Sequence, residues 1–152
     1  MRNGTVLKFA AVACALIAGA QTAFASDADM AKTFGLPGEW AIDCKQPASL
    51  ASPHQLFTLA AGGTVTATLS LGEKYPDQHY AVSDLHLGDP STLAATWTRA
   101  SDGYTARATI KKSGNKTRAW TSTNPKTGEA LIRNAVYAHN GKPVPWVEKC
   151  SK

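Results

Sequence analysis

The chain has 152 residues and a formal net charge of +5 at neutral pH. Its apolar content of 43% and its charged content of 18% are typical of a globular protein, which excludes an intrinsically disordered chain. No apolar run reaches the roughly 20 residues that a membrane-spanning helix requires, so no transmembrane segment is expected. The length suits one domain with one hydrophobic core.

The first 25 residues have the three parts of an export signal in the usual order. A start containing Arg2 and Lys8 precedes an apolar run, which ends in the small-residue cleavage site Ala23–Ala25. We expect cleavage before Ser26, a mature domain over 26–152, and a location in the periplasm or outside the cell. Loss of Arg2 and Lys8 leaves fourteen basic and eleven acidic residues, a net charge of +3.

After the signal, a short helical segment is expected first and strands follow. The segment 27–36 favours one or two helical turns, with Asp27 as a cap and with Met30 and Phe34 facing inward. Apolar and polar residues then alternate with period two, and turn residues recur every eight to twelve positions, which is typical of an all-β sandwich or barrel. The predicted strands cover 39–44, 55–60, 64–71, 78–87, 92–99, 104–111, 116–122 and 130–138, and a ninth short strand covers 145–149.

Short links between successive strands favour an up-and-down antiparallel order. Eight strands in this order can close into a barrel, which removes both edges of the sheet. We therefore predict a single antiparallel barrel of about eight strands, with a two-sheet sandwich as the alternative. Alternation predicts that Val65, Ala67, Ala106 and Ile110 face the interior, whereas Arg107 faces solvent.

Removal of the signal would leave two cysteines, Cys44 and Cys150. A pair of cysteines in an exported chain predicts a disulfide, here between the start and the end of the domain. No Cys-x-x-Cys spacing is present, which argues against a redox role.

Charge is distributed unevenly along the mature chain, with a net of −5 over 26–89 and of +8 over 90–152. In an up-and-down barrel the two halves of the sequence lie on different sides, so an acidic side and a basic side are expected. The basic side would suit an anionic partner or a membrane surface, or it would only keep the strands soluble. Its predicted centre consists of Arg99, Arg107, Lys111, Lys112, Lys116 and Arg118.

No motif for catalysis, metal binding or cofactor binding is recognisable. The chain lacks the His-Glu-x-x-His zinc pattern, the Gly-x-Ser-x-Gly nucleophile turn and a phosphate-binding glycine loop. The histidines are scattered, and His79 and His86 would point to opposite faces of a regular strand. We therefore expect a non-catalytic protein without a metal or cofactor. Nucleic acid is not an expected partner, because alternation separates Tyr104 from Arg107 and Lys111 and because the chain carries an export signal.

Aromatic residues are spread over the predicted strands and are the candidate binding residues. If inward alanines leave space, the rings would line a pocket for a small apolar ligand. If rings and alanines interdigitate instead, the interior is filled. The candidate ligand-binding residues are Trp40, Trp97, Tyr104 and Trp120, and the alanines expected to face inward are Ala67, Ala81, Ala95, Ala106 and Ala108.

The motif Gly38–Trp40 opens the first predicted strand and resembles the Gly-x-Trp at the start of lipocalins and other calycin-like barrels. The resemblance implies that Trp40 closes the floor of a barrel and that a basic residue near the last strand, here Arg133, stacks on its ring. Small periplasmic inhibitors of bacterial metalloproteases look similar in outline, with a barrel, a Gly-x-Trp and one disulfide. That likeness implies that 26–29 enters a protease cleft, although Cys150 lies much later in this chain than the second cysteine of those inhibitors.

Together these patterns predict an exported, non-catalytic protein that holds a small apolar or amphipathic ligand in a β-barrel. One alternative is a protein-binding module such as a protease inhibitor. The other is an envelope protein whose basic C-terminal half docks on an anionic partner. The sequence indicates neither the identity of the ligand nor the oligomeric state.

Overall fold

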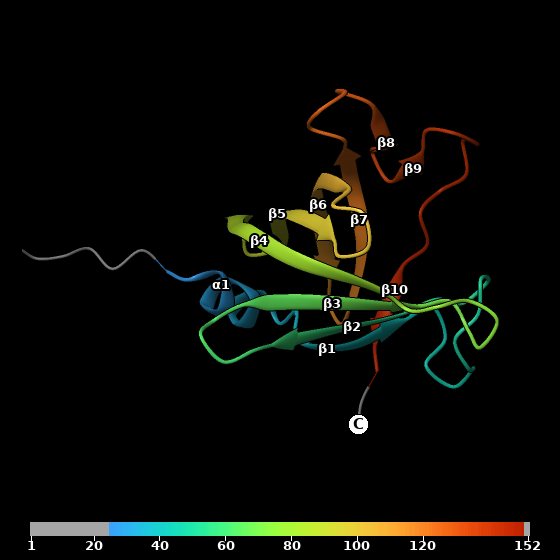
Figure 1. Cartoon of the computed structure of the whole chain (residues 1–152), viewed down its shortest axis with the longest axis horizontal. Helices are drawn as coiled ribbons and strands as arrows, with labels where there is room; N and C mark the ends of the chain where they lie inside the picture. The colour runs from blue at the N-terminus through green and yellow to red at the C-terminus, as the bar shows by residue number, and fades with distance from the viewer. Residues whose placement is uncertain (1–24, 151–152) are drawn as a thin grey trace, which may run out of the picture.

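The structure, a computed structural model, describes residues 25–150 and shows one helix and ten strands in this part of the chain (Figure 1). The expected export signal lies outside the described residues except for Ala25. The helix α1 covers Asp27–Phe34. The strands are β1 (Gly38–Ala41), β2 (His54–Leu59), β3 (Val65–Ser70), β4 (Gln78–Asp89), β5 (Thr92–Arg99), β6 (Thr105–Ser113), β7 (Lys116–Thr123), β8 (Ala130–Arg133), β9 (Val136–Tyr137) and β10 (Val147–Lys149).

Eight of these strands close into an antiparallel barrel. β1 to β7 pair in chain order, and β10 pairs with both β1 and β7. Trp40 stands opposite Lys149 in the first of these pairings, and Thr117 stands opposite Val147 in the second. The structure therefore confirms the predicted all-β barrel with a short N-terminal helix, and the two-sheet sandwich is not adopted.

The strand predicted over 130–138 differs from the structure. The chain reverses at Asn134 and Ala135, whose φ angles of 50° and 59° are left-handed, so this stretch forms the short hairpin of β8 and β9. Ala135 is buried and donates its N–H to the carbonyl of Trp120, which holds the turn against β7. The hairpin leaves the barrel (Figure 1), and β10 takes the eighth place that the prediction gave to 130–138.

Helix α1 begins and ends with standard capping interactions. The Ser26 hydroxyl accepts a hydrogen bond from the backbone N–H of Asp29, and the Asp29 carboxylate accepts one from the N–H of Ser26. Gly35 ends the helix with a φ of 82°, a conformation that costs glycine little. Phe34 and Leu36, on either side of this glycine, are each only 1% exposed. The helix therefore contributes its C-terminal end to the core.

Side chains from three strands of the barrel bind the carbonyl groups at the end of α1. Lys112 on β6 donates to the carbonyl of Phe34 over 2.6 Å, and Lys149 on β10 donates to that of Gly35 over 2.8 Å. The indole N–H of Trp40 on β1 donates to the next carbonyl along the chain over 2.8 Å. β1 and β10 are neighbours, and only β7 separates β10 from β6, so these three contacts fasten the end of α1 to one continuous part of the barrel wall. The lysines also place positive charge at the negative end of the helix dipole.

The C-terminal end of α1, which we call the helical plug, belongs to the buried core of the barrel. Phe34 and Leu36 pack with Val65, Leu93 and Ile110 in one buried cluster. Burial of side chains of this size stabilises the fold by about 1.5–3 kcal/mol each. This end of the interior is therefore filled.

The predicted alternation holds in β3, where Val65 and Ala67 are buried, and in β6, where Arg107 is exposed. It is wrong for Ala81, which is exposed. Val82 next to it is the inward residue of β4, so Ala81 lies on the outer face.

Candidate ligand-binding site

A cavity of about 410 Å³ lies inside the barrel between the helical plug and the opposite end. Leu36 and Ile110 border it on the side of α1. Tyr104 borders it on the other side, next to the turn between β5 and β6. Its wall is predominantly apolar and includes Phe57, Leu69, Trp97, Ala106, Ala108 and Val147.

Small side chains produce this space. Ala108 on β6 stands opposite Ala95 on β5 and Ser122 on β7, so three small residues meet at one level of the barrel. Ala106 stands opposite Trp97 at the next level. Because Ala106 leaves the space beside this indole ring free, the interior is open where the plug ends. The interior is thus filled at one end and hollow at the other, which combines the two alternatives left open by the sequence.

Trp97 is the central ring of an aromatic cluster in the wall. Its centroid lies 5.5 Å from that of Phe57 and 6.1 Å from that of Tyr80, in edge-to-face arrangements. Its indole nitrogen is buried and has no hydrogen-bond partner among the described residues. Neighbouring rings therefore fix the orientation of Trp97 by packing.

The far end of the cavity carries a polar group. Arg99 donates two hydrogen bonds, of 2.9 and 2.7 Å, to the carboxylate of Asp102 and lies 5.2 Å above the ring of Tyr104. The hydrogen bond from Arg99 lowers the pKa of Asp102 to about 2, assisted by the backbone N–H of Tyr104. The hydrogen bond to Asp102 in turn raises the pKa of Arg99. Beside it, the Tyr80 hydroxyl donates to Gln78 over 2.6 Å. An apolar interior therefore ends in a charged but locally neutral mouth.

The wall of the cavity has a seam along β7. This strand pairs with β10 near Thr117 and with β8 from Ser122 onward. Between these points Val144 and Pro145, which belong to no strand, line the cavity. The seam is thus the part of the wall that lacks a continuous strand pairing.

The structure brings two of the four predicted ligand-binding residues to the cavity, Trp97 and Tyr104. Trp40 is 3% exposed and lies in the floor, bound to the end of α1. Trp120 lies at a β-bulge, which shifts the register between Thr109 and the next residue of β6, and it does not line the cavity. The basic group on the ring of Trp40 is Lys149, at 5.5 Å.

Arg133, which the lipocalin resemblance placed on that ring, is instead exposed at the turn between β8 and β9. Several lining residues carried no recognisable sequence signal. They include Leu36, Phe57, Leu69, Tyr80 and Ile110.

The predicted basic side is divided in the structure. Lys112 binds the end of α1, and Arg99 is paired with Asp102 at the mouth of the cavity. The remaining four residues lie on β6 and β7, where alternation places their side chains on the outer face. These are Arg107, Lys111, Lys116 and Arg118.

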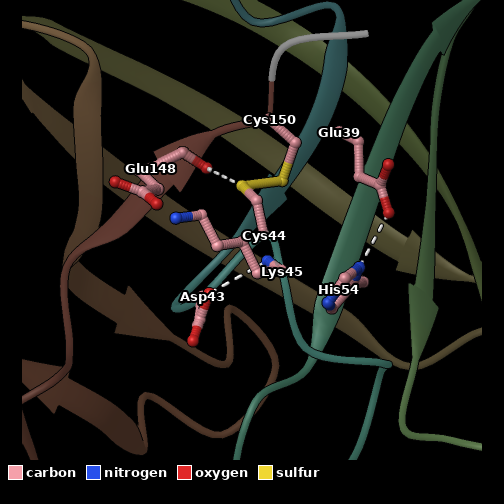
Figure 2. Close-up of a disulfide and its surroundings, with 7 residues drawn as sticks. All are labelled: Glu39, Asp43, Cys44, Lys45, His54, Glu148 and Cys150. Carbon is pink, nitrogen blue, oxygen red and sulfur yellow. Dashed lines mark hydrogen bonds and ion pairs between the residues drawn. A yellow bond between two sulfur atoms is a disulfide. The ribbon is translucent and has the colours of Figure 1, made fainter.

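The predicted disulfide joins Cys44 to Cys150 (Figure 2). It links the segment after β1 to the residue after β10, where the barrel closes. The Cys44 sulfur lies 3.7 Å from the carbonyl oxygen of Glu148. Nearby, His54 and Glu39 form an ion pair or hydrogen bond of 2.7 Å between β2 and β1 (Figure 2).

Within residues 25–150, no three side chains of histidine, cysteine, aspartate or glutamate are grouped as a metal site would require. No helix of this part of the chain is long and apolar enough to cross a bilayer. Comparisons with known protein families, curated proteins and solved structures found no match. The function is therefore inferred from the geometry of the chain itself.

Proposed function

We propose that this protein is a non-catalytic carrier that holds a small apolar or amphipathic ligand inside its barrel. The cavity of about 410 Å³ carries the proposal. Pockets for small molecules have volumes of about 300–1,000 Å³ and walls that are mostly apolar with a few polar groups. Binding to a predominantly apolar site is favoured because it removes the apolar surface of the ligand from water.

The distribution of polar groups favours an amphipathic ligand. Its apolar part would lie between Ile110 and Trp97, and its polar part would lie near Arg99 and Tyr104 at the mouth. The N–H groups of Arg99 that Asp102 does not occupy are donors for such a polar part. The wall between these ends offers alanine and aromatic surface with few hydrogen-bonding groups.

A periplasmic or extracellular location agrees with this role. The Cys44–Cys150 disulfide requires an oxidising compartment to form and persist. A carrier in such a compartment would shield an apolar molecule from water between membranes or cells.

A protease inhibitor is less well supported by the geometry. The segment that would enter a protease cleft begins at Ser26, but this residue caps α1. Ala28 and Ala31 are buried, and Phe34 is part of the core. Extending this segment into a protease would therefore remove core packing.

The test is the binding of an uncharged, environment-sensitive naphthylamine dye, measured by fluorescence titration. We expect the wild type to bind the dye and Ala108→Trp to lose at least tenfold in affinity, because the added indole fills the cavity. Ala81→Trp is the matched control, since it adds the same side chain on the exposed outer face of β4.

Thermal unfolding establishes whether both variants are folded. If folded Ala108→Trp binds the dye as tightly as the wild type, the cavity is not the site and the proposal fails. Native mass spectrometry of gently purified protein would then identify a natural passenger by its mass.

A further inference from the structure

The outer face of β6 and β7 carries cations that are held in place by indole rings. The Nζ atom of Lys111 lies 4.0 Å above the ring of Trp120. The Cζ atom of Arg118 lies 5.4 Å from the same ring and 4.4 Å from that of Trp146. Cations and rings therefore alternate in a stack, which we call the stacked face. Its members, in order, are Lys111, Trp120, Arg118 and Trp146.

The charges of the stacked face are not neutralised by neighbouring ion pairs. No acidic residue occurs between Gly103 and Gly128, a stretch that contains both strands. Within the described part of the chain, neither Lys111 nor Arg118 forms an ion pair. Two carboxylates border the face, Asp89 and Glu148. Hydrogen bonds from Ser91 hold Asp89, and Glu148 stands opposite Lys116.

A hollow of about 610 Å³, lined by alanines and by polar side chains, adjoins this face. Threonines of β5, β6 and β7 line it together with the exposed Arg107, and β4 contributes Asp84 and His86. The hollow therefore offers hydroxyl groups and a further cation next to the stack. Arg107, like the stack, has no ion pair among residues 25–150.

From this arrangement we propose that the stacked face docks on a bilayer that contains anionic lipids. Lysine and arginine near such a surface attract the headgroups, and indole rings prefer the interface between headgroups and acyl chains. A sheet face with half-buried indoles and fixed cations presents both features on one side of the molecule.

The position of the cavity favours a lipid surface over a soluble polyanion. Arg118 belongs to the stacked face and, like Val147, also borders the cavity, beside the seam along β7. This step relies on the proposed carrier function. An apolar ligand resides in membranes, so a seam turned toward the bilayer lies where the ligand would enter or leave. A soluble polyanion would need the charges but not this seam.

The test is co-sedimentation with vesicles of phosphatidylcholine, with and without phosphatidylglycerol. We expect binding only to the anionic vesicles, and binding that weakens with added salt, since salt screens exposed charges. The double variant Lys111→Gln/Arg118→Gln should bind more weakly, by about fivefold for each charge removed. The matched control Lys45→Gln/Lys74→Gln changes the net charge equally, but its lysines lie in other loops, and it should bind as the wild type does.

Two further variants control for a folding defect and separate the docking proposal from the carrier proposal. Arg107→Gln removes an exposed charge next to the stack, and it should weaken binding even if loss of Arg118 perturbs folding. Ala108→Trp, which fills the cavity, should still sediment with the vesicles. Vesicle binding by a wild type that does not bind the dye would contradict only the carrier function.

Three outcomes would overturn the docking proposal. One is an absence of sedimentation with anionic vesicles at low salt, whether or not the protein binds soluble heparin. Another is an equal loss of binding in the stacked-face variant and the control, which would indicate net charge alone. The third is binding that does not respond to salt.

Discussion

The pairing of Arg99 with Asp102 makes the mouth of the cavity sensitive only to strong acid. The pKa of Asp102 is lowered to about 2, first by the hydrogen bond from Arg99. A group with a lowered pKa in the folded state stabilises it above the unfolded pKa of about 4, and this contribution is lost as the pH falls through the folded pKa.

We therefore expect the carboxyl ¹³C signal of Asp102 to titrate near pH 2. The difference in melting temperature between the wild type and Asp102→Asn should be constant from pH 5 to pH 8 and should shrink below about pH 4. A midpoint near 4 would show that the pair does not form in solution.

Gly72 is the residue at which a single methyl group should be most costly. Its φ is +93°, and a Cβ atom there would lie 2.6 Å from the carbonyl oxygen of Ala48 in the neighbouring loop. Gly62 has a similar φ of +87° but has open space around it. Gly62→Ala should cost about 1 kcal/mol from backbone strain alone. Gly72→Ala should cost at least about 1 kcal/mol more, because backbone atoms must also move. Urea unfolding of the two variants measures the difference, and equal losses would show that the two loops separate easily.

Sequence reasoning about single side chains succeeded where the strands are regular. Trp97 on β5 lines the cavity as alternation predicts, and so does Tyr104, which directly precedes β6. Trp120 does not line the cavity as predicted, because it lies at a β-bulge. A bulge gives no clear signal in the sequence and removes the following residues from the simple alternation. The binding role of all these residues remains a prediction.

At the scale of the elements, the contact between β6 and α1 can be tested by one substitution. Lys112→Met keeps the aliphatic stem but removes the charged hydrogen bond of 2.6 Å to the carbonyl of Phe34. We expect a loss of about 1.5–3 kcal/mol in the free energy of unfolding. Lys111→Met is the control, since Lys111 faces outward and its ammonium group lies over the ring of Trp120, a contact worth about 0.5–1 kcal/mol. Urea unfolding compares them, and equal losses would contradict the anchoring of the helix by Lys112.

Elements of the fold were predictable to different degrees. The strands β2 to β7 follow from apolar alternation and from turns marked by glycine, because burial on one face repeats every second residue. The hairpin at 134–135 did not follow, because asparagine and alanine occupy its left-handed positions where glycine would have been the signal. The last strand, β10, is only three residues long, and its place beside β1 depends on pairing across the whole chain.

At the scale of the whole molecule, the disulfide links residues separated by 106 positions. Closing a loop of about a hundred residues restricts the unfolded chain and stabilises the fold by about 4–5 kcal/mol in the chain-entropy model. Cys44→Ser/Cys150→Ser should lose stability of this order in urea unfolding. A loss below about 1 kcal/mol would indicate that the pairing of β1 with β10 holds the ends together unaided.

The short strand β10, which closes the barrel, has a consequence for folding during synthesis. During synthesis β1 to β7 emerge in order and can pair as each becomes complete, but the neighbour that β1 requires on its other side is made last. Until residues 147–149 leave the ribosome, the nascent chain is an open sheet with two bare edges. Bare edges pair readily with other chains, so this intermediate is exposed to aggregation until β10 is in place. Pairing of residues 147–149 with β1 and β7 thus removes both edges that could join another chain.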